Sequence, residues 1–162
     1  MSSNPLRAVI QRLGRQKWFA ATFRGVAPSI DRFLYRVTKG RVALLTGTGL
    51  PTLLLTTTGR KSGQQRTVPL LYTRHQGAYV VVGSNWGRQN HPAWSLNLTA
   101  DPAASVQIRG RAAKVRARII EGEEREQIWN SELLKTWPGY EDYAERSGRH
   151  IRIFALEPDG GK

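Results

Sequence analysis

The sequence contains no cysteine and few acidic residues, and each shortage narrows the choice of function. Without cysteine there can be no disulfide, no thiolate nucleophile and no cysteine-ligated metal. The histidines, His75, His91 and His150, lie far apart and match no metal-ligand spacing, so no metal site is expected. Nowhere do about 18 apolar residues follow one another, as a membrane-spanning helix requires. Residues 1–21 also lack the apolar stretch of a signal peptide, which predicts a cytoplasmic protein.

Because acidic residues are scarce, the 162-residue chain carries a formal net charge of +13. Much of the excess lies in residues 1–50, where nine basic residues accompany a single acid, Asp31. Within the same region, apolar residues recur with helical spacing over residues 6–13 and 30–37. We therefore expect a basic amphipathic helical segment over residues 1–38.

Two interpretations of this basic segment remain open. Cationic amphipathic helices bind anionic membrane surfaces, where each cation contributes about 1 kcal/mol. Such contact would place the protein at the inner face of the cell membrane. Alternatively, the second helix docks on the rest of the protein and the first is a basic tail. Nucleic-acid binding is not expected, because the basic stretches lack interleaved stacking aromatics and a recognition motif.

The sequence predicts that residues 39–158 form one mainly antiparallel β domain of the α+β class, with peripheral helices. Residues 159–162 are expected to form a short tail. Short helices are expected from Pro92 to just before Asp101, over 123–135, and over 140–146. Six runs rich in β-branched and aromatic residues, enough strands for a barrel, lie at 52–58, 67–74, 78–84, 105–109, 112–120 and 150–156. Tight hairpin turns are expected at Gln76-Gly77, between the second and third runs, and at Gly110, between the fourth and fifth.

The most informative segment is the turn at 59–63, which reads Gly-Arg-Lys-Ser-Gly and is followed by Arg66. Its two glycines allow tight or left-handed backbone that turns amide N–H groups toward one point. Two guanidinium groups and one ammonium around that point suit a phosphate or carboxylates. A Walker A loop is excluded, because an arginine separates the glycine from the lysine. The segment predicts a phosphate clamp, with a solvated hairpin turn as the alternative.

A second segment combines a glycine-bounded loop at 83–87 with the start of the helix near Pro92. The N-terminus of that helix favours negative charge. Trp86 in the loop is either an exposed patch or a pocket wall. Trp94 is either a core anchor or a ring-stacking residue, and the alternative for His91 is a helix cap.

A third segment places Tyr140 and Tyr143 three residues apart, so that both phenols share one helical face. They either cover a ligand or pack against the barrel. The chain offers no Ser-His-Asp constellation, no close carboxylate pair and no thiol, which agrees with a reaction carried by a cofactor.

Three stretches, in this order, resemble the deazaflavin-dependent nitroreductase family. They are GRKSGQQRTVPLLY at 59–72, VVVGSNWGRQNHPAWSLNL at 80–98 and EEREQIWNSELLKTWPGYEDY at 123–143, and the resemblance extends from about Leu44 to Pro158. It implies a six-stranded split β-barrel, of the FMN-binding split-barrel type, that binds coenzyme F420. It also implies hydride transfer from the reduced 8-hydroxy-5-deazaflavin to a quinone such as menaquinone, a nitroaromatic or an activated enone.

The resemblance assigns roles to individual residues. Tyr140 and Tyr143 would line the acceptor pocket, and together with Ser84 they are candidates for donating a proton or hydrogen bond to the product. The coenzyme would contact the clamp, the strand that leaves it, the glycine-bounded loop and the start of the following helix. These residues are Arg60, Lys61, Ser62, Gly63, Arg66, Pro69, Leu70, Ser84, Asn85, Trp86, Gly87, His91, Pro92, Ala93 and Trp94.

The phosphodiester and oligoglutamate tail of the coenzyme agree with the cationic composition, and Lys39, Arg41 or Arg88 are further candidates for contacting the glutamates. Leu71 and Ser95 stand where family members often have tyrosine, which predicts a wider or less polar acceptor pocket. A lipid quinone would also explain the cationic amphipathic N-terminus. Two alternatives remain: a non-catalytic F420 carrier at the membrane, and an FMN protein on a related barrel.

Overall fold

The computed structural model describes Val9, Arg12 and residues 50–160. The amphipathic helices expected within residues 1–38 therefore fall almost wholly outside the described residues. Val9 and Arg12 are both helical and exposed. Within the described part of the chain, no helix is long and apolar enough to cross a bilayer.

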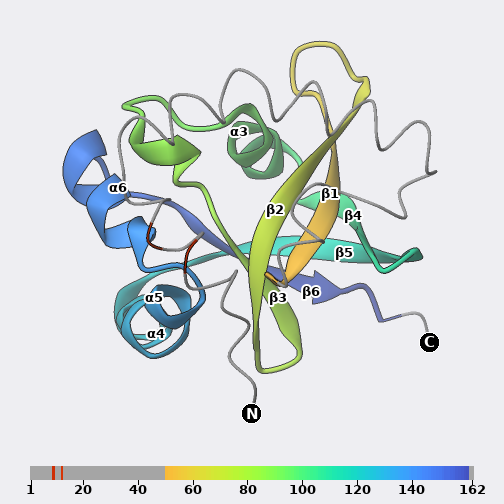
Figure 1. Ribbon diagram of the computed structural model, residues 1–162. Coiled ribbons are helices and arrows are strands. Elements are labelled where there is room, and N and C mark those ends of the chain that lie inside the picture. The colour runs from red at the N-terminus through yellow and green to blue at the C-terminus, as the bar shows by residue number, and fades with distance from the viewer. Residues whose placement is uncertain (1–8, 10–11, 13–49, 161–162) are drawn as a thin grey trace.

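Six antiparallel strands form a closed barrel in the order β1-β2-β3-β6-β5-β4 (Figure 1). The predicted six-stranded barrel is confirmed, although β6 begins three residues later than expected and β2 two residues earlier. The strands are β1 (Thr52–Thr58), β2 (Gln65–His75), β3 (Ala78–Val82), β4 (Ala103–Ile108), β5 (Arg111–Ile120) and β6 (Ile153–Pro158).

Two tight turns close the predicted hairpins. Gln76 and Gly77 join β2 to β3 with φ angles of 47° and 86°, and Arg109 and Gly110 join β4 to β5 with 49° and 81°. Positive φ at both central residues is typical of the type I′ turn, whose twist matches that of the strands. The glycines predicted at these turns are therefore where the backbone needs them.

The barrel interior is filled by side chains that alternate along the strands. Phe154 and Leu156 of β6 point inward, whereas Ile153 and Ala155 point outward. The helix α3 (Ala93–Ala100) adds Trp94 and Leu98 to the interior. The remaining buried members are Leu53, Leu55, Val81, Val106 and Val115.

A second apolar cluster covers the outer faces of β3 and β6 with helices (Figure 1). These are α4 (Gly122–Ile128), the π-helical turn η3 (Trp129–Leu133), α5 (Leu134–Thr136) and α6 (Gly139–Ser147). The helix predicted over 123–135 thus contains a wide turn. Ile128 and Leu133 are both fully buried, yet residues five apart on a regular α-helix point about 140° from each other. The wider turn lets both face the barrel.

Candidate functional site

In the turn between β1 and β2, backbone amides donate hydrogen bonds to acceptors within the turn itself. Gly63 N–H donates to the Gly59 carbonyl at 2.7 Å, and Gly59 N–H donates to the Gln64 carbonyl at 2.8 Å. Ser62 N–H also donates to Gly59, and Gln64 N–H donates to the Ser62 hydroxyl. The expectation that these amides converge on a ligand is therefore wrong, because their N–H groups already donate hydrogen bonds within the turn. Anion binding at this loop falls to the side chains.

Asn97 of α3 holds the clamp in place, and sequence reasoning missed it. Its side-chain oxygen accepts a hydrogen bond from Arg60 N–H at 3.1 Å, and its amide group donates to the Thr57 hydroxyl at 3.1 Å. Asn97 is 5% exposed. The signal in the sequence was weak: an asparagine between two leucines, in a helix that asparagine does not favour.

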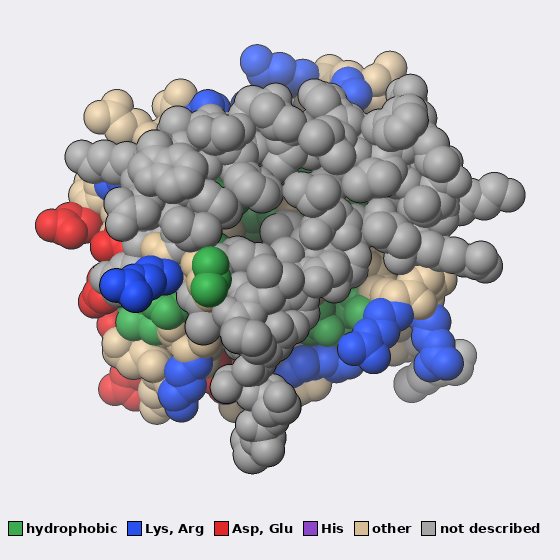
Figure 2. Space-filling model, viewed as in Figure 1, with side chains coloured by type: hydrophobic (Ala, Val, Ile, Leu, Met, Phe, Trp, Pro, Cys, Tyr) green, Lys and Arg blue, Asp and Glu red, His purple; other side chains and the backbone are tan. Residues whose placement is uncertain are grey.

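The cationic side chains of the clamp remain available to a ligand. Arg60, Lys61 and Arg66 are exposed, and no acidic side chain in the described part of the chain forms an ion pair with them. Arg66 donates only to the Gln64 side chain, at 3.0 Å. Acidic side chains gather instead over α4 and α6, at the left of Figure 2. Unpaired cations of this kind fit the phosphate and carboxylates of F420.

Beyond the clamp, β2 alternates between the two apolar clusters. Leu70 packs against the interior cluster, whereas Leu71 packs against the outer one. Pro69 shares the outward face with Leu71, because side chains of a strand alternate. Leu70 and Pro69 therefore lie on opposite faces of β2, and their predicted contacts with the coenzyme ring stay a prediction.

The loop from β3 to α3 has unusual backbone angles. Asn85, Trp86 and Gly87 have φ angles of 47°, 58° and 75°, and the three residues form the short helix η2 (Asn85–Gly87). A side chain at position 87 would lie 3.2 Å from the Tyr143 Cα atom, so only glycine fits. Non-glycine residues with such angles cost about 1–2 kcal/mol each. Strain of this kind persists only where the surroundings impose it.

Arg149 supplies that restraint, and sequence reasoning missed this residue too. Its guanidinium donates to the carbonyls of Gly83, Ser84 and Arg88 at 2.9, 3.0 and 2.9 Å. It also contacts His91 Nδ1 at 3.1 Å. Arg149 follows α6, more than 55 residues after the loop, so no local pattern could have revealed the contact.

His91 does not cap α3, which settles one of the open alternatives. The residue before the helix is Pro92, and no side chain caps the first turn. Burial lowers the pKa of His91 below its usual value, and the charges of Arg152, Arg149 and His150 lower it further. Pro92 is half-buried, and Ala93 is exposed.

The tryptophans differ in environment. Trp94 is buried and packs edge-on against Phe154, with ring centroids 5.7 Å apart, so it is a core anchor. Trp86 is half-buried and lies 6.2 Å from the Tyr143 ring. Of these two tryptophans, Trp86 is therefore the one whose side chain is not fully buried and so is better placed to contact a ligand.

Tyr140 and Tyr143 pack in the outer cluster, at 6% and 2% exposed. Their rings are 6.5 Å apart, and Tyr140 also lies 6.2 Å from Trp129. Burial raises the pKa of Tyr140, so its phenol keeps its proton. The structure thus supports the packing alternative for both tyrosines. Ser95 is also fully buried and does not widen an open pocket.

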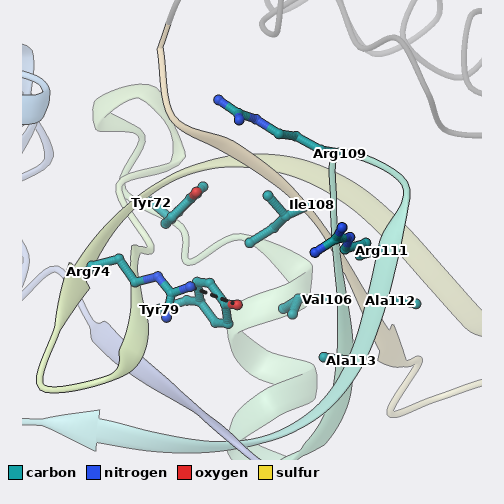
Figure 3. Close-up of a pocket in the computed structure, with 9 residues that line it drawn as sticks. All are labelled: Tyr72, Arg74, Tyr79, Val106, Ile108, Arg109, Arg111, Ala112 and Ala113. Carbon is teal, nitrogen blue, oxygen red and sulfur yellow. Dashed lines mark hydrogen bonds between the residues drawn. The ribbon is translucent and has the colours of Figure 1, made fainter.

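A cavity of about 510 Å³ opens at the other end of β1 from the clamp (Figure 3). The Arg74 guanidinium lies 4.1 Å from the centre of the Tyr79 ring and donates to the Tyr79 hydroxyl. None of the predicted site residues lines this cavity. The lining residues are Tyr72, Arg74, Tyr79, Val106, Ile108, Arg109, Arg111, Ala112 and Ala113.

Comparison with known proteins identifies close similarities. The family model described as F420H(2)-dependent quinone reductase matches residues 30–158. The F420H(2)-dependent quinone reductase of Mycobacterium tuberculosis strain H37Rv is 31% identical over 125 residues, which are 76% of this chain and 84% of that protein.

Solved structures agree. An F420-H2 dependent reductase (FDR-A) is 40% identical with a TM-score of 0.60, covering 66% of this chain and 94% of the other. A structure described as a domain-swapped dimer is 33% identical with a TM-score of 0.62, covering 80% and 98%.

These similarities confirm the resemblance inferred from the three stretches, the split-barrel fold, the oxidoreductase class and F420 as the coenzyme. The chain belongs to the F420H(2)-dependent quinone reductase family.

Proposed function

We propose that the protein passes a hydride from reduced F420 to a quinone of the menaquinone type. The observation that carries this proposal is that one short helix, α3, joins the two parts of the site. The loop 83–91 ends at His91, and Pro92 then leads directly into α3. Farther along the helix, the Asn97 side chain accepts a hydrogen bond from the Arg60 amide of the clamp. The five helical residues from Ala93 to Asn97 span about 7.5 Å. A single coenzyme molecule can therefore contact both parts.

The residues of the chain would divide the work of binding. Arg60, Lys61 and Arg66 would hold the phosphate and carboxylates through charge-assisted hydrogen bonds. Pro69 and Trp86 would flank the ring with apolar surface. When bound, reduced F420 supplies the hydride, so the protein needs no covalent nucleophile. Its contribution is to orient the coenzyme and the acceptor and to exclude water.

Ser84 is the donor that we propose for the acceptor oxygen. Of the three predicted donors, Tyr140 and Tyr143 are buried in the outer cluster, whereas Ser84 is half-buried in the loop. A hydrogen bond to an oxygen that gains negative charge lowers the barrier by about 3 kcal/mol in well-studied sites. Tyr143, whose ring lies 6.2 Å from that of Trp86, would then support Trp86 from behind.

A lipid quinone also favours a peripheral membrane location. Residues 1–38 carry the basic amphipathic pattern that binds anionic lipid surfaces. We propose that this segment brings the cytoplasmic enzyme to the inner face of the membrane, where its acceptor is found. Flotation of the full-length protein with anionic vesicles, but not with neutral ones, is the expected result. Equal flotation with both would contradict an electrostatic contact.

The decisive experiment follows oxidation of reduced F420 with menaquinone analogues, nitroimidazoles and enones as acceptors. We expect turnover with all three classes and the highest kcat/KM with the quinones. Ser84→Ala should lower kcat about 100-fold and weaken F420 binding much less than that. Coenzyme binding without turnover would identify a carrier instead. Purification with a flavin spectrum and no F420 binding would identify an FMN protein.

A further inference from the structure

Among the described residues, one ring nitrogen of His91 forms a hydrogen bond within the protein and the other does not. Nδ1 lies 3.1 Å from Arg149 Nη1. An arginine guanidinium donates hydrogen bonds and accepts none, so Nδ1 must be the acceptor and carries no hydrogen. The hydrogen of the neutral ring therefore resides on Nε2. Within the described residues, Nε2 has no hydrogen-bond partner.

Arg149 cannot turn away from His91 without losing other contacts. The same guanidinium holds the carbonyls of Gly83, Ser84 and Arg88, which lie on both sides of the strained residues Asn85 and Trp86. Four hydrogen bonds from one planar group define its orientation. The hydrogen bond to Nδ1 is thus built into the loop that forms the ring side of the site.

We propose that Arg149 is a positioning residue that keeps His91 neutral with its hydrogen on Nε2, so that His91 donates a hydrogen bond to an oxygen of bound F420. This inference rests on the proposed function, because it assumes that the coenzyme ring lies beside the loop 83–91. The ligand atom is a carbonyl or anionic oxygen, since a neutral N–H donor recognises either.

The charges around His91 favour the neutral form of its ring. Arg149, Arg152 and His150 all face it, and each opposes a second positive charge. Burial acts in the same direction and is the largest cause of the lowered pKa. A protonated His91 would have to place a hydrogen between Nδ1 and the Arg149 guanidinium. Coenzyme binding by His91 should therefore change less between pH 6 and pH 8 than it would if His91 titrated at about 6.5, as a free histidine does.

The first test is nitrogen NMR of histidine-labelled protein, with and without F420. We expect His91 to titrate below the ordinary histidine pKa, to carry its hydrogen on Nε2 when neutral, and to show a shift of the Nε2 signal when F420 binds. A hydrogen on Nδ1, or titration near the ordinary histidine pKa, would overturn the proposal. This measurement on the free protein is independent of catalysis. If F420 failed to bind while the tautomer was as expected, the proposed function would fail instead.

The second test measures F420 affinity by calorimetry at both ends of the pH range. His91→Leu removes the donor and should weaken binding about five- to tenfold. His91→Gln retains an N–H donor near the position of Nε2, and we expect it to bind within about threefold of the wild type. Equal loss in both variants would show that the ring acts through packing alone.

Arg149→Met separates the positioning role from simple loop support. In this variant His91 should titrate at a higher pH than in the wild type, and F420 affinity should become pH-dependent. Arg116→Met, which removes an exposed arginine from β5, is the charge-matched control and should change neither property. In the double variant with His91→Leu, the pH dependence should disappear. A pH-independent loss in Arg149→Met alone would contradict action through His91.

Discussion

The clamp at residues 59–66 and the wall formed by the loop 83–91 with α6 serve one site, yet they are built in opposite ways. The clamp is a local turn whose amides bond to one another and whose cations point to solvent. The wall is held by contacts between distant segments, with Arg149 bonding to four loop residues and Gly87 packed against Tyr143. The clamp should therefore tolerate backbone changes that the wall cannot, and side-chain changes in the clamp should affect binding more than folding.

Substituting one glycine in each region tests this difference most directly. Gly87→Ala places a Cβ atom 3.2 Å from the Tyr143 Cα at a φ of +75°. We expect a loss of about 2–4 kcal/mol in the free energy of unfolding, from strain and overpacking together. Gly63→Ala has a similar φ of +68° but no atom within 4 Å of the added Cβ. It should cost only about 1 kcal/mol. Urea unfolding of both variants measures the contrast, which equal losses would contradict.

Asn97 is the point where the clamp depends on tertiary structure. Asn97→Leu removes the acceptor of the Arg60 amide and the donor to the buried Thr57 hydroxyl. We expect a stability loss of about 2–3 kcal/mol, because buried unpaired groups are costly. F420 affinity should also fall as the loop loses its support. The control is Asn130→Leu, since Asn130 is exposed and its side chain, among the residues that the structure describes, bonds only the Glu126 carbonyl. If Asn97→Leu were as stable as this control, the support role would be refuted.

Lys61 should matter for the coenzyme and hardly at all for the fold. It is exposed, with no ion pair to any described acidic residue. Lys61→Ala is expected to weaken F420 binding about tenfold at low salt, since hydrogen bonds to charged groups contribute about 1.5–3 kcal/mol. The difference should shrink at high salt through screening. Lys114→Ala, an exposed lysine on β5, should bind like the wild type. Calorimetry at two salt concentrations measures the F420 affinity of both variants. An equal loss of affinity in the two would contradict a specific role for Lys61.

The wall should respond to alkaline pH through Tyr140. Its pKa in the folded protein is raised by burial, whereas an unfolded tyrosine titrates at about 10. Above that pH the unfolded chain releases the proton and the folded protein retains it, so stability falls as pH rises. Tyr140→Phe should remove this share, at most about 1.4 kcal/mol per pH unit. The free energy of unfolding, measured at several pH values from 9 to 11, should therefore fall less steeply with pH in the variant than in the wild type. Equal slopes in the two proteins would contradict a raised pKa of Tyr140.

Local patterns predicted those parts of the molecule whose structure depends on near neighbours. The strands followed from β-branched runs, and the type I′ turns followed from Gly77 and Gly110. The helix 123–135 was predicted without its π-helical turn, because burial of Ile128 and Leu133 against the barrel favours a wider spacing than local propensity does. The helices within residues 1–38 stay a prediction. The division of the chain into residues 1–38, 39–158 and 159–162 also stays a prediction.

The candidate site shows the same division. The charges of the clamp could be taken directly from the sequence, but the internal bonding of its amides could not. Both tryptophans were candidates for contact with the coenzyme ring, and the packing of α3 into the barrel decided that Trp94 is a core residue while Trp86 belongs to the wall. The two tyrosines of α6 were placed on one helical face correctly, and tertiary burial decided that this face meets the core.

By itself, the sequence determined the barrel, the cationic turn, and the family and coenzyme through three ordered stretches, because these depend on residue type and short spacing. Only the tertiary structure decided which nitrogen of His91 is committed, how the strained loop is held and what supports the clamp. Arg149 and Asn97 act on segments that lie dozens of residues away in the chain. Folding alone brings such groups within hydrogen-bond distance, and no local pattern encodes that meeting.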